Sequence, residues 1–125
     1  MWRALLQGTL FKLGFWALVV GVAVLSLLPG EYLPPQTVNI WDKAQHASAF
    51  TVLGAWGLLV YPHRPWSVLL GLLTFGGAIE LAQASTSWRF GDWHDWLADA
   101  VGLALGGALA WWPSQRLGVT DARGC

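Results

Sequence analysis

Charged and amide side chains between positions 42 and 99 have types and spacings that could support binding or acid–base chemistry. Asp42 lies four residues before His46, and Asp95 lies four residues before Asp99. Residues four apart are neighbours on one face of a helix, so each pair can act at one place. The predicted polar cluster, a candidate ligand-binding site, comprises Asp42, Lys43, His46, Glu80, Gln83, Arg89, Asp92, Asp95 and Asp99.

The charges of this cluster do not balance, because five acids stand against Lys43 and Arg89. In poorly hydrated surroundings such an excess requires protonated acids or a bound cation. His46 could be that cation, could bind a metal or could relay a proton. A divalent cation is therefore a candidate cofactor, with candidate ligands His46, Glu80, Asp95 and Asp99. Alternatively, the network is purely architectural, and the two bases hold carboxylates to join helix ends.

The composition indicates a membrane protein. Of the 125 residues, 55% are hydrophobic and only 11% are charged, and the ten tryptophans suit a membrane interface. The formal charge is zero, which provides no electrostatic argument for a nucleic-acid partner. Cys125 is the only cysteine, so neither an intrachain disulfide nor a cysteine-based metal site is expected.

Four apolar stretches are long enough to span a bilayer, and they predict a single all-α domain over residues 1–125, an integral membrane four-helix bundle. The first stretch is expected to be an uncleaved span, because no small-residue cleavage site follows it. The short loop PHRP at residues 62–65 predicts that the second and third spans form a helical hairpin. Asp42 is expected to be the N-cap of the second span. Pro113 is expected to end the last helix before a loose tail. The expected spans are 11–29, 44–61, 66–84 and 93–112.

Basic residues predict the orientation of these spans. Five of the seven lie on one face of the predicted bundle and only Lys43 and Arg89 on the other, which places both termini in the cytoplasm. The start of the second span, the end of the third and the start of the fourth then meet at the outer end. Glu80 and Asp99 would lie at or inside the edge of the hydrocarbon, where an acid is by default a candidate functional residue.

Small residues recur every four positions in the fourth stretch, at Ala98, Gly102, Gly106 and Ala110. Such a stripe allows another helix backbone to approach closely. We expect Gly102 and Gly106 to pack against a helix of the same chain rather than of a second copy.

Three blocks of this sequence resemble the VanZ-like family of small bacterial membrane proteins, and together they cover about residues 42–107. Their motifs are D-K-x-x-H-x-x-x-F, E-x-x-Q and R-x-x-D-x-x-D-x-x-x-N-x-x-G-x-x-x-G. They fall on Asp42, Lys43, His46 and Phe50, on Glu80 and Gln83, and on Arg89, Asp92, Asp95, Asp99, Gly102 and Gly106. One position departs from the pattern, because Asp99 stands where the family usually has asparagine and adds a negative charge.

The resemblance implies a multi-pass protein of the bacterial inner (plasma) membrane, in a family named after a member linked to teicoplanin resistance. It supplies no reaction, and whether the protein is an enzyme stays open. The leading hypothesis is that the cluster binds a polar or lipid-linked cell-envelope precursor at the outer surface. Lys43 and Arg89 would contact its anionic group. An interfacial collar of aromatic residues would hold its apolar part at the membrane interface; its members are Trp88, Phe90, Trp93 and Trp96.

Three other hypotheses remain. The first is an intramembrane metal-dependent hydrolase or transferase that acts on a lipid headgroup. The second is proton or ion handling through Glu80, Asp99 and His46, although no complete pathway across the membrane is visible. The third is a structural or interaction protein whose charges only hold the bundle together.

Overall fold

The apolar stretches fold as helices. In the computed structural model of the chain these are α2 (Thr9–Leu27), α3 (Asn39–Val60), α4 (Pro65–Ser85) and α5 (Trp93–Ala122). The structure describes residues 4–5, 8–28, 39–86 and 93–122, with the backbone alone at 39–42 and 112–122. This described part contains four helices and no strand, which confirms the all-α prediction.

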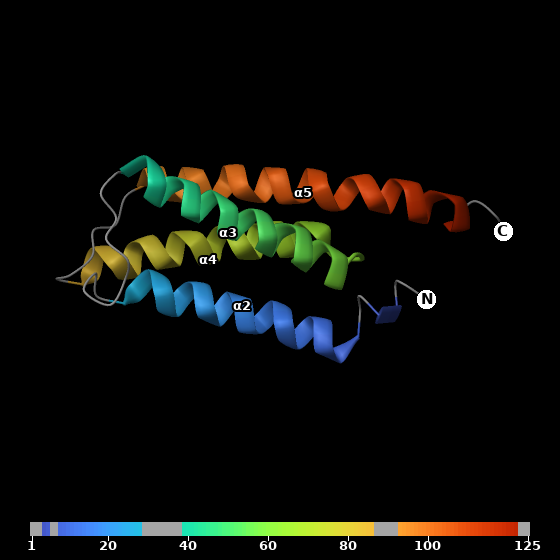
Figure 1. The fold of residues 1–125 in the computed structure, drawn as a ribbon, viewed down its shortest axis with the longest axis horizontal. Coiled ribbons are helices and arrows are strands. Elements are labelled where there is room, and N and C mark those ends of the chain that lie inside the picture. Colours follow the sequence, from blue (N-terminus) through green and yellow to red (C-terminus); the bar gives the residue numbers. More distant parts are fainter. Residues whose placement is uncertain (1–3, 6–7, 29–38, 87–92, 123–125) are drawn as a thin grey trace.

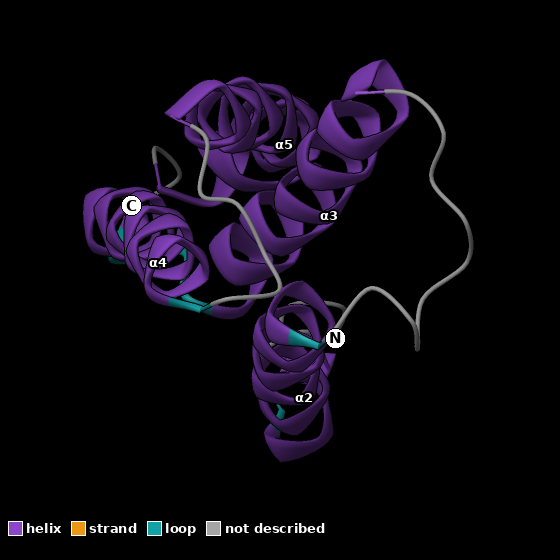
Figure 2. Cartoon of the chain, turned by 90° about the vertical axis from the view of Figure 1, so that its left-hand side faces the viewer, coloured by secondary structure: helices purple, strands orange, loops and turns teal. Residues whose placement is uncertain are grey.

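Successive helices run in opposite directions, and α3 and α5 are therefore parallel to each other (Figure 1). A short connection at residues 61–64 joins α3 to α4 and makes them an antiparallel hairpin. The end of α2, the start of α3, the end of α4 and the start of α5 consequently share one end of the bundle. In the end-on view α3 and α5 form a close pair (Figure 2). Helix α4 lies to the left of this pair, and α2 lies below it.

Glycines allow the close approach of α3 and α5. A Cβ atom on Gly102 would overlap the carbonyl oxygen of Ala47 and lie 3.0 Å from the backbone nitrogen of Thr51. A Cβ atom on Gly106 would overlap the Thr51 carbonyl oxygen and lie 2.9 Å from the Ala55 nitrogen. The small-residue stripe thus packs within the chain, backbone against backbone.

The apolar core lies between the helices, and apolar side chains also cover much of the outer surface. Buried core residues come from all four helices and include Phe15, Phe50, Leu53, Val60, Leu72 and Leu103. The outward-facing set includes Leu10, Trp66, Leu81, Val101 and Leu109. A water-soluble domain of this size seldom exposes so much apolar surface.

Two predicted helix ends are wrong. Helix α3 begins at Asn39, so Asp42 lies inside the helix and is not its N-cap. Helix α5 continues through Pro113 to Ala122 instead of ending at Trp112. Proline removes one backbone donor and is unfavourable inside a helix, yet α5 continues across this position.

Membrane-spanning capacity differs among the helices. By length and composition α2 and α4 could each cross a membrane. Within the described residues α3 and α5 do not reach the same hydropathy, because they carry charged residues of the site, among them Lys43, Asp95 and Asp99. The prediction of four helices is confirmed. Only two of the described helices are long and apolar enough to span a membrane, which is weak support for a membrane location.

Candidate functional site

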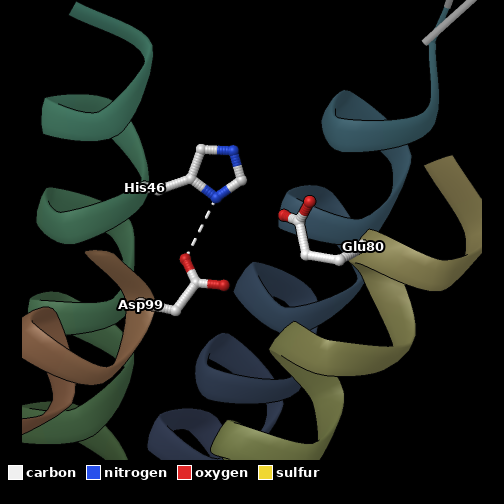
Figure 3. Close-up of side chains that lie close together, drawn as sticks. All are labelled: His46, Glu80 and Asp99. Carbon is white, nitrogen blue, oxygen red and sulfur yellow. Dashed lines mark hydrogen bonds and ion pairs between the residues drawn. The ribbon is translucent and has the colours of Figure 1, made fainter. Parts of the chain in front are cut away.

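Three ionisable side chains from three helices meet at one end of the bundle. His46 of α3, Glu80 of α4 and Asp99 of α5 point toward one another (Figure 3), and one ligand atom from each lies within 4.8 Å of the other two. The Nδ1 atom of His46 is 3.0 Å from Oδ1 of Asp99. We call these three residues the central trio.

The parallel packing of α3 and α5 aligns two pairs across the interface. Lys43 and His46 are three residues apart and share one face of α3. Asp95 and Asp99 are four residues apart and share one face of α5. Lys43 Nζ donates to Asp95 Oδ1 at 3.2 Å, one turn before the contact of His46 with Asp99. The same register places Gly102 against α3 further along. The glycine contact and the polar contacts therefore depend on one helix pairing.

The acids of the site are removed from solvent. Asp99 is 0% exposed, and Asp95 and Glu80 are also buried. Burying a carboxylate is costly unless other groups compensate its charge. In the central trio two carboxylates face a single imidazole, so full ionisation would leave a net negative charge even if His46 were protonated. A proton, a bound cation or a neighbouring base would have to balance it.

A glycine makes room beside Asp99. Its Oδ2 atom is buried and has no hydrogen-bond partner within the described residues. A Cβ atom on Gly76 would lie 2.7 Å from this oxygen and 3.2 Å from Cζ of Phe50. Only a glycine at position 76 therefore lets α4 pack this closely against the carboxyl group of Asp99.

Two predicted site residues make contacts away from the trio. Gln83 is buried, and its Nε2 donates to the carbonyl oxygen of Ser26 at 2.7 Å, which ties the end of α4 to the end of α2. Asp95 faces Lys43 rather than the trio. Trp96, expected in the interfacial collar, donates its indole N–H to the Leu73 carbonyl oxygen at 2.9 Å.

Other predicted residues cannot be located at the site. Arg89 and Asp92 lie outside the described residues, as does the side chain of Asp42, whose backbone is in α3. Gly76 and Ser26 were not predicted to contribute. Gly76 lies four residues before Glu80 and so shares its helix face, a spacing that could have identified it. The contribution of Ser26 through a backbone carbonyl has no sequence signature.

The arrangement can perform three kinds of chemistry. The trio can bind a cation or hold a shared proton, and Lys43, whose side chain is 34% exposed, can contact an anionic group from outside. Comparison with known proteins does not select among them: no family model matches this chain, and no curated protein or solved structure matches it. The resemblance to the VanZ-like family accordingly stays a prediction.

Proposed function

We propose that this chain is a multi-pass protein of the bacterial plasma membrane whose polar site, at the outer end of the bundle, binds a polar or lipid-linked cell-envelope ligand. The observation that carries the proposal is an inverted distribution of polarity. Leu10 is 82% exposed and Leu81 is 76% exposed, whereas Asp99 is 0% exposed. Apolar residues outward and ionisable residues inward are expected where lipid is the solvent.

The tryptophans of α5 support the same interpretation. Trp93 and Trp111 of α5 are both more than half exposed. Their separation of 18 positions corresponds to about 27 Å of helix, close to the thickness of a bilayer hydrocarbon core. Tryptophans at this spacing suit two membrane interfaces.

The ligand class follows from the position and charge of the site. The polar side chains gather at one end of the bundle, so they would meet a headgroup rather than an acyl chain. Lys43 is partly exposed while Asp95 holds its amine at 3.2 Å, which positions a positive charge for an anionic ligand. The resemblance to the VanZ-like family adds the expectation that ligand binding changes susceptibility to teicoplanin.

A susceptibility assay tests this function. Expression of the wild-type chain in a glycopeptide-susceptible Gram-positive host should raise the minimum inhibitory concentration of teicoplanin. Lys43→Met should abolish the increase, because loss of a charge-assisted hydrogen bond weakens binding by at least about tenfold.

Lys12→Met is the matched control. It removes one lysine at the opposite end of the bundle, where Lys12 Nζ lies 5.6 Å from the centroid of the Tyr61 ring. This variant should retain the resistance, and both variants must be present in the membrane at wild-type amounts. Unchanged susceptibility with the wild-type chain, or equal resistance with Lys43→Met, would contradict the proposal.

A further inference from the structure

We propose that His46, Glu80 and Asp99 bind one divalent transition-metal ion, with Zn²⁺ as the representative ion. This inference goes beyond the ligand-binding function and does not depend on it, since metal binding can be measured without any other ligand. It rests on four features of the trio: the spacing of its donor atoms, a buried oxygen without a hydrogen-bond partner among the described residues, the donor types and the charge.

The donor atoms are nearly at coordination distance from a common centre. In a tetrahedral zinc site with bonds of about 2.1 Å, neighbouring ligand atoms are about 3.4 Å apart. His46 Nδ1 and Asp99 Oδ1 are 3.0 Å apart, and one donor atom from each of the three residues lies within 4.8 Å of the others. A different rotamer of the Glu80 side chain would bring its carboxylate closer to the other two donors.

Asp99 supplies the second, independent observation. The residue is 0% exposed, and its Oδ2 has no hydrogen-bond partner within the described residues. Such an oxygen is costly to bury unless something compensates it. In Figure 3 the Asp99 carboxyl group lies below the His46 ring, with one oxygen on the side of Glu80. Gly76 is the residue of α4 that faces this oxygen, and it offers no side-chain donor: a Cβ atom there would lie only 2.7 Å away.

The donor set selects the class of metal. One imidazole nitrogen and two carboxylate oxygens suit the borderline first-row ions, whereas Mg²⁺ and Ca²⁺ prefer oxygen alone. A dication also neutralises two buried carboxylates without requiring a proton on His46. With the ion bound, the trio would carry no net charge, and a low-dielectric site favours a neutral set of groups.

The structure removes Asp95 from the sequence-based set of metal candidates. Its Oδ1 is held by Lys43 at 3.2 Å, and Asp95 does not belong to the group of donors that converge. The remaining three ligands leave a fourth coordination position. Open positions of this kind accept water or an oxygen atom of a polar ligand.

Metal analysis of the detergent-purified full chain tests the site, with a tag that lacks histidines and no chelator in the buffers. Protein from zinc-supplemented cells should contain about one zinc per chain, and His46→Ala, Glu80→Gln and Asp99→Asn should each reduce the content at least about tenfold. Asp95→Asn is the matched control, because it removes a buried carboxylate one turn from Asp99 and should retain the metal.

Cobalt spectroscopy keeps the test decisive if a ligand variant fails to fold. Wild-type chain loaded with Co²⁺ should give the visible absorption of a low-coordinate cobalt site with nitrogen and oxygen ligands, and added Zn²⁺ should remove it. A wild-type chain that carries no zinc and leaves the spectrum of aqueous Co²⁺ unchanged would overturn the proposal. Equal loss of zinc in Asp95→Asn and the ligand variants would also overturn the assignment of ligands.

Discussion

Among single residues, Asp99 has the contacts that matter most for the chemistry of the central trio. It is fully buried, it contacts His46 through Oδ1, and its Oδ2 is next to the bare backbone of Gly76. Position 99 is also where the sequence departs from the VanZ-like pattern, with aspartate in place of asparagine. An asparagine would keep the shape of the side chain but would lose the charge and one acceptor. The extra acceptor is the atom that the metal proposal uses.

Gly76→Ala should therefore disturb the site without changing any charge. The new methyl group would lie 2.7 Å from Asp99 Oδ2 and 3.2 Å from Phe50 Cζ, and both groups are buried. Overpacking of this kind costs about 1–3 kcal/mol in the free energy of unfolding. Thermal unfolding in detergent, followed by tryptophan fluorescence, should show a lowered midpoint.

Gly71→Ala on the same helix provides the control. Nothing lies within 4 Å of a Cβ atom at position 71. Alanine is a better helix former than glycine by about 1 kcal/mol, so this variant should be as stable as the wild type or more stable. A Gly76→Ala protein as stable as the Gly71→Ala protein would show that position 76 is not tightly enclosed.

At the scale of helices, the parallel pairing of α3 and α5 carries most of the site. The glycine contacts of α5 with Thr51 and Ala55 fix the separation of the two axes, and the same register brings Lys43 to Asp95 and His46 to Asp99. A helix pairing held by backbone contact is sensitive to any added side-chain volume.

Gly106→Ala should weaken this pairing. The added Cβ atom would overlap the Thr51 carbonyl oxygen, which belongs to the backbone of α3 and cannot rotate away. We expect a loss of about 1–3 kcal/mol in unfolding free energy, together with a wider separation of α3 and α5. Thermal unfolding would measure the first, and cross-linking of cysteines introduced at facing positions would measure the second.

The adjacent glycine is a control with the same chemical change. For Gly107 the nearest atom to a Cβ is Cδ1 of Leu58, at an ordinary contact distance of 3.9 Å. Gly107→Ala should unfold at or above the wild-type midpoint. If the two variants were equally stable, the close contact of α5 with α3 would be wrong.

At the scale of the whole molecule, the up-and-down order of the helices predicts which connections share a side of the membrane. Helix α4 runs from Pro65 to Ser85, and its 21 residues correspond to about 31 Å, the thickness of a hydrocarbon core. Its two ends should therefore face opposite compartments. Basic residues predict that the end at the α3–α4 connection is cytoplasmic.

Cysteine labelling on intact cells checks this topology. In a Cys125→Ser background, Ser85→Cys should react with a membrane-impermeant maleimide, and His63→Cys should react only after lysis. Both positions are exposed in the folded chain, so burial within the protein does not limit the reaction. Equal labelling of both cysteines on intact cells would contradict a membrane-spanning α4.

Much of the fold could be predicted from the sequence, because helix formation depends on local composition. Apolar stretches of about 20 residues separated by polar segments indicated four helices. Helix ends were less predictable: α3 begins before Asp42, and α5 continues past Pro113. A capping residue or a proline shifts the local free energy by about 1–3 kcal/mol, which neighbouring turns can outweigh.

The sequence also determined which residues could form a site, since few ionisable groups lie in or beside the apolar stretches. Only the tertiary structure decided which of them meet. Helix spacing gives the face that a residue shares with its neighbours but not the rotation of that face relative to other helices. The packing of α3 on α5 sets that rotation, so Asp99 meets His46, Asp95 meets Lys43 and Gln83 turns away to Ser26.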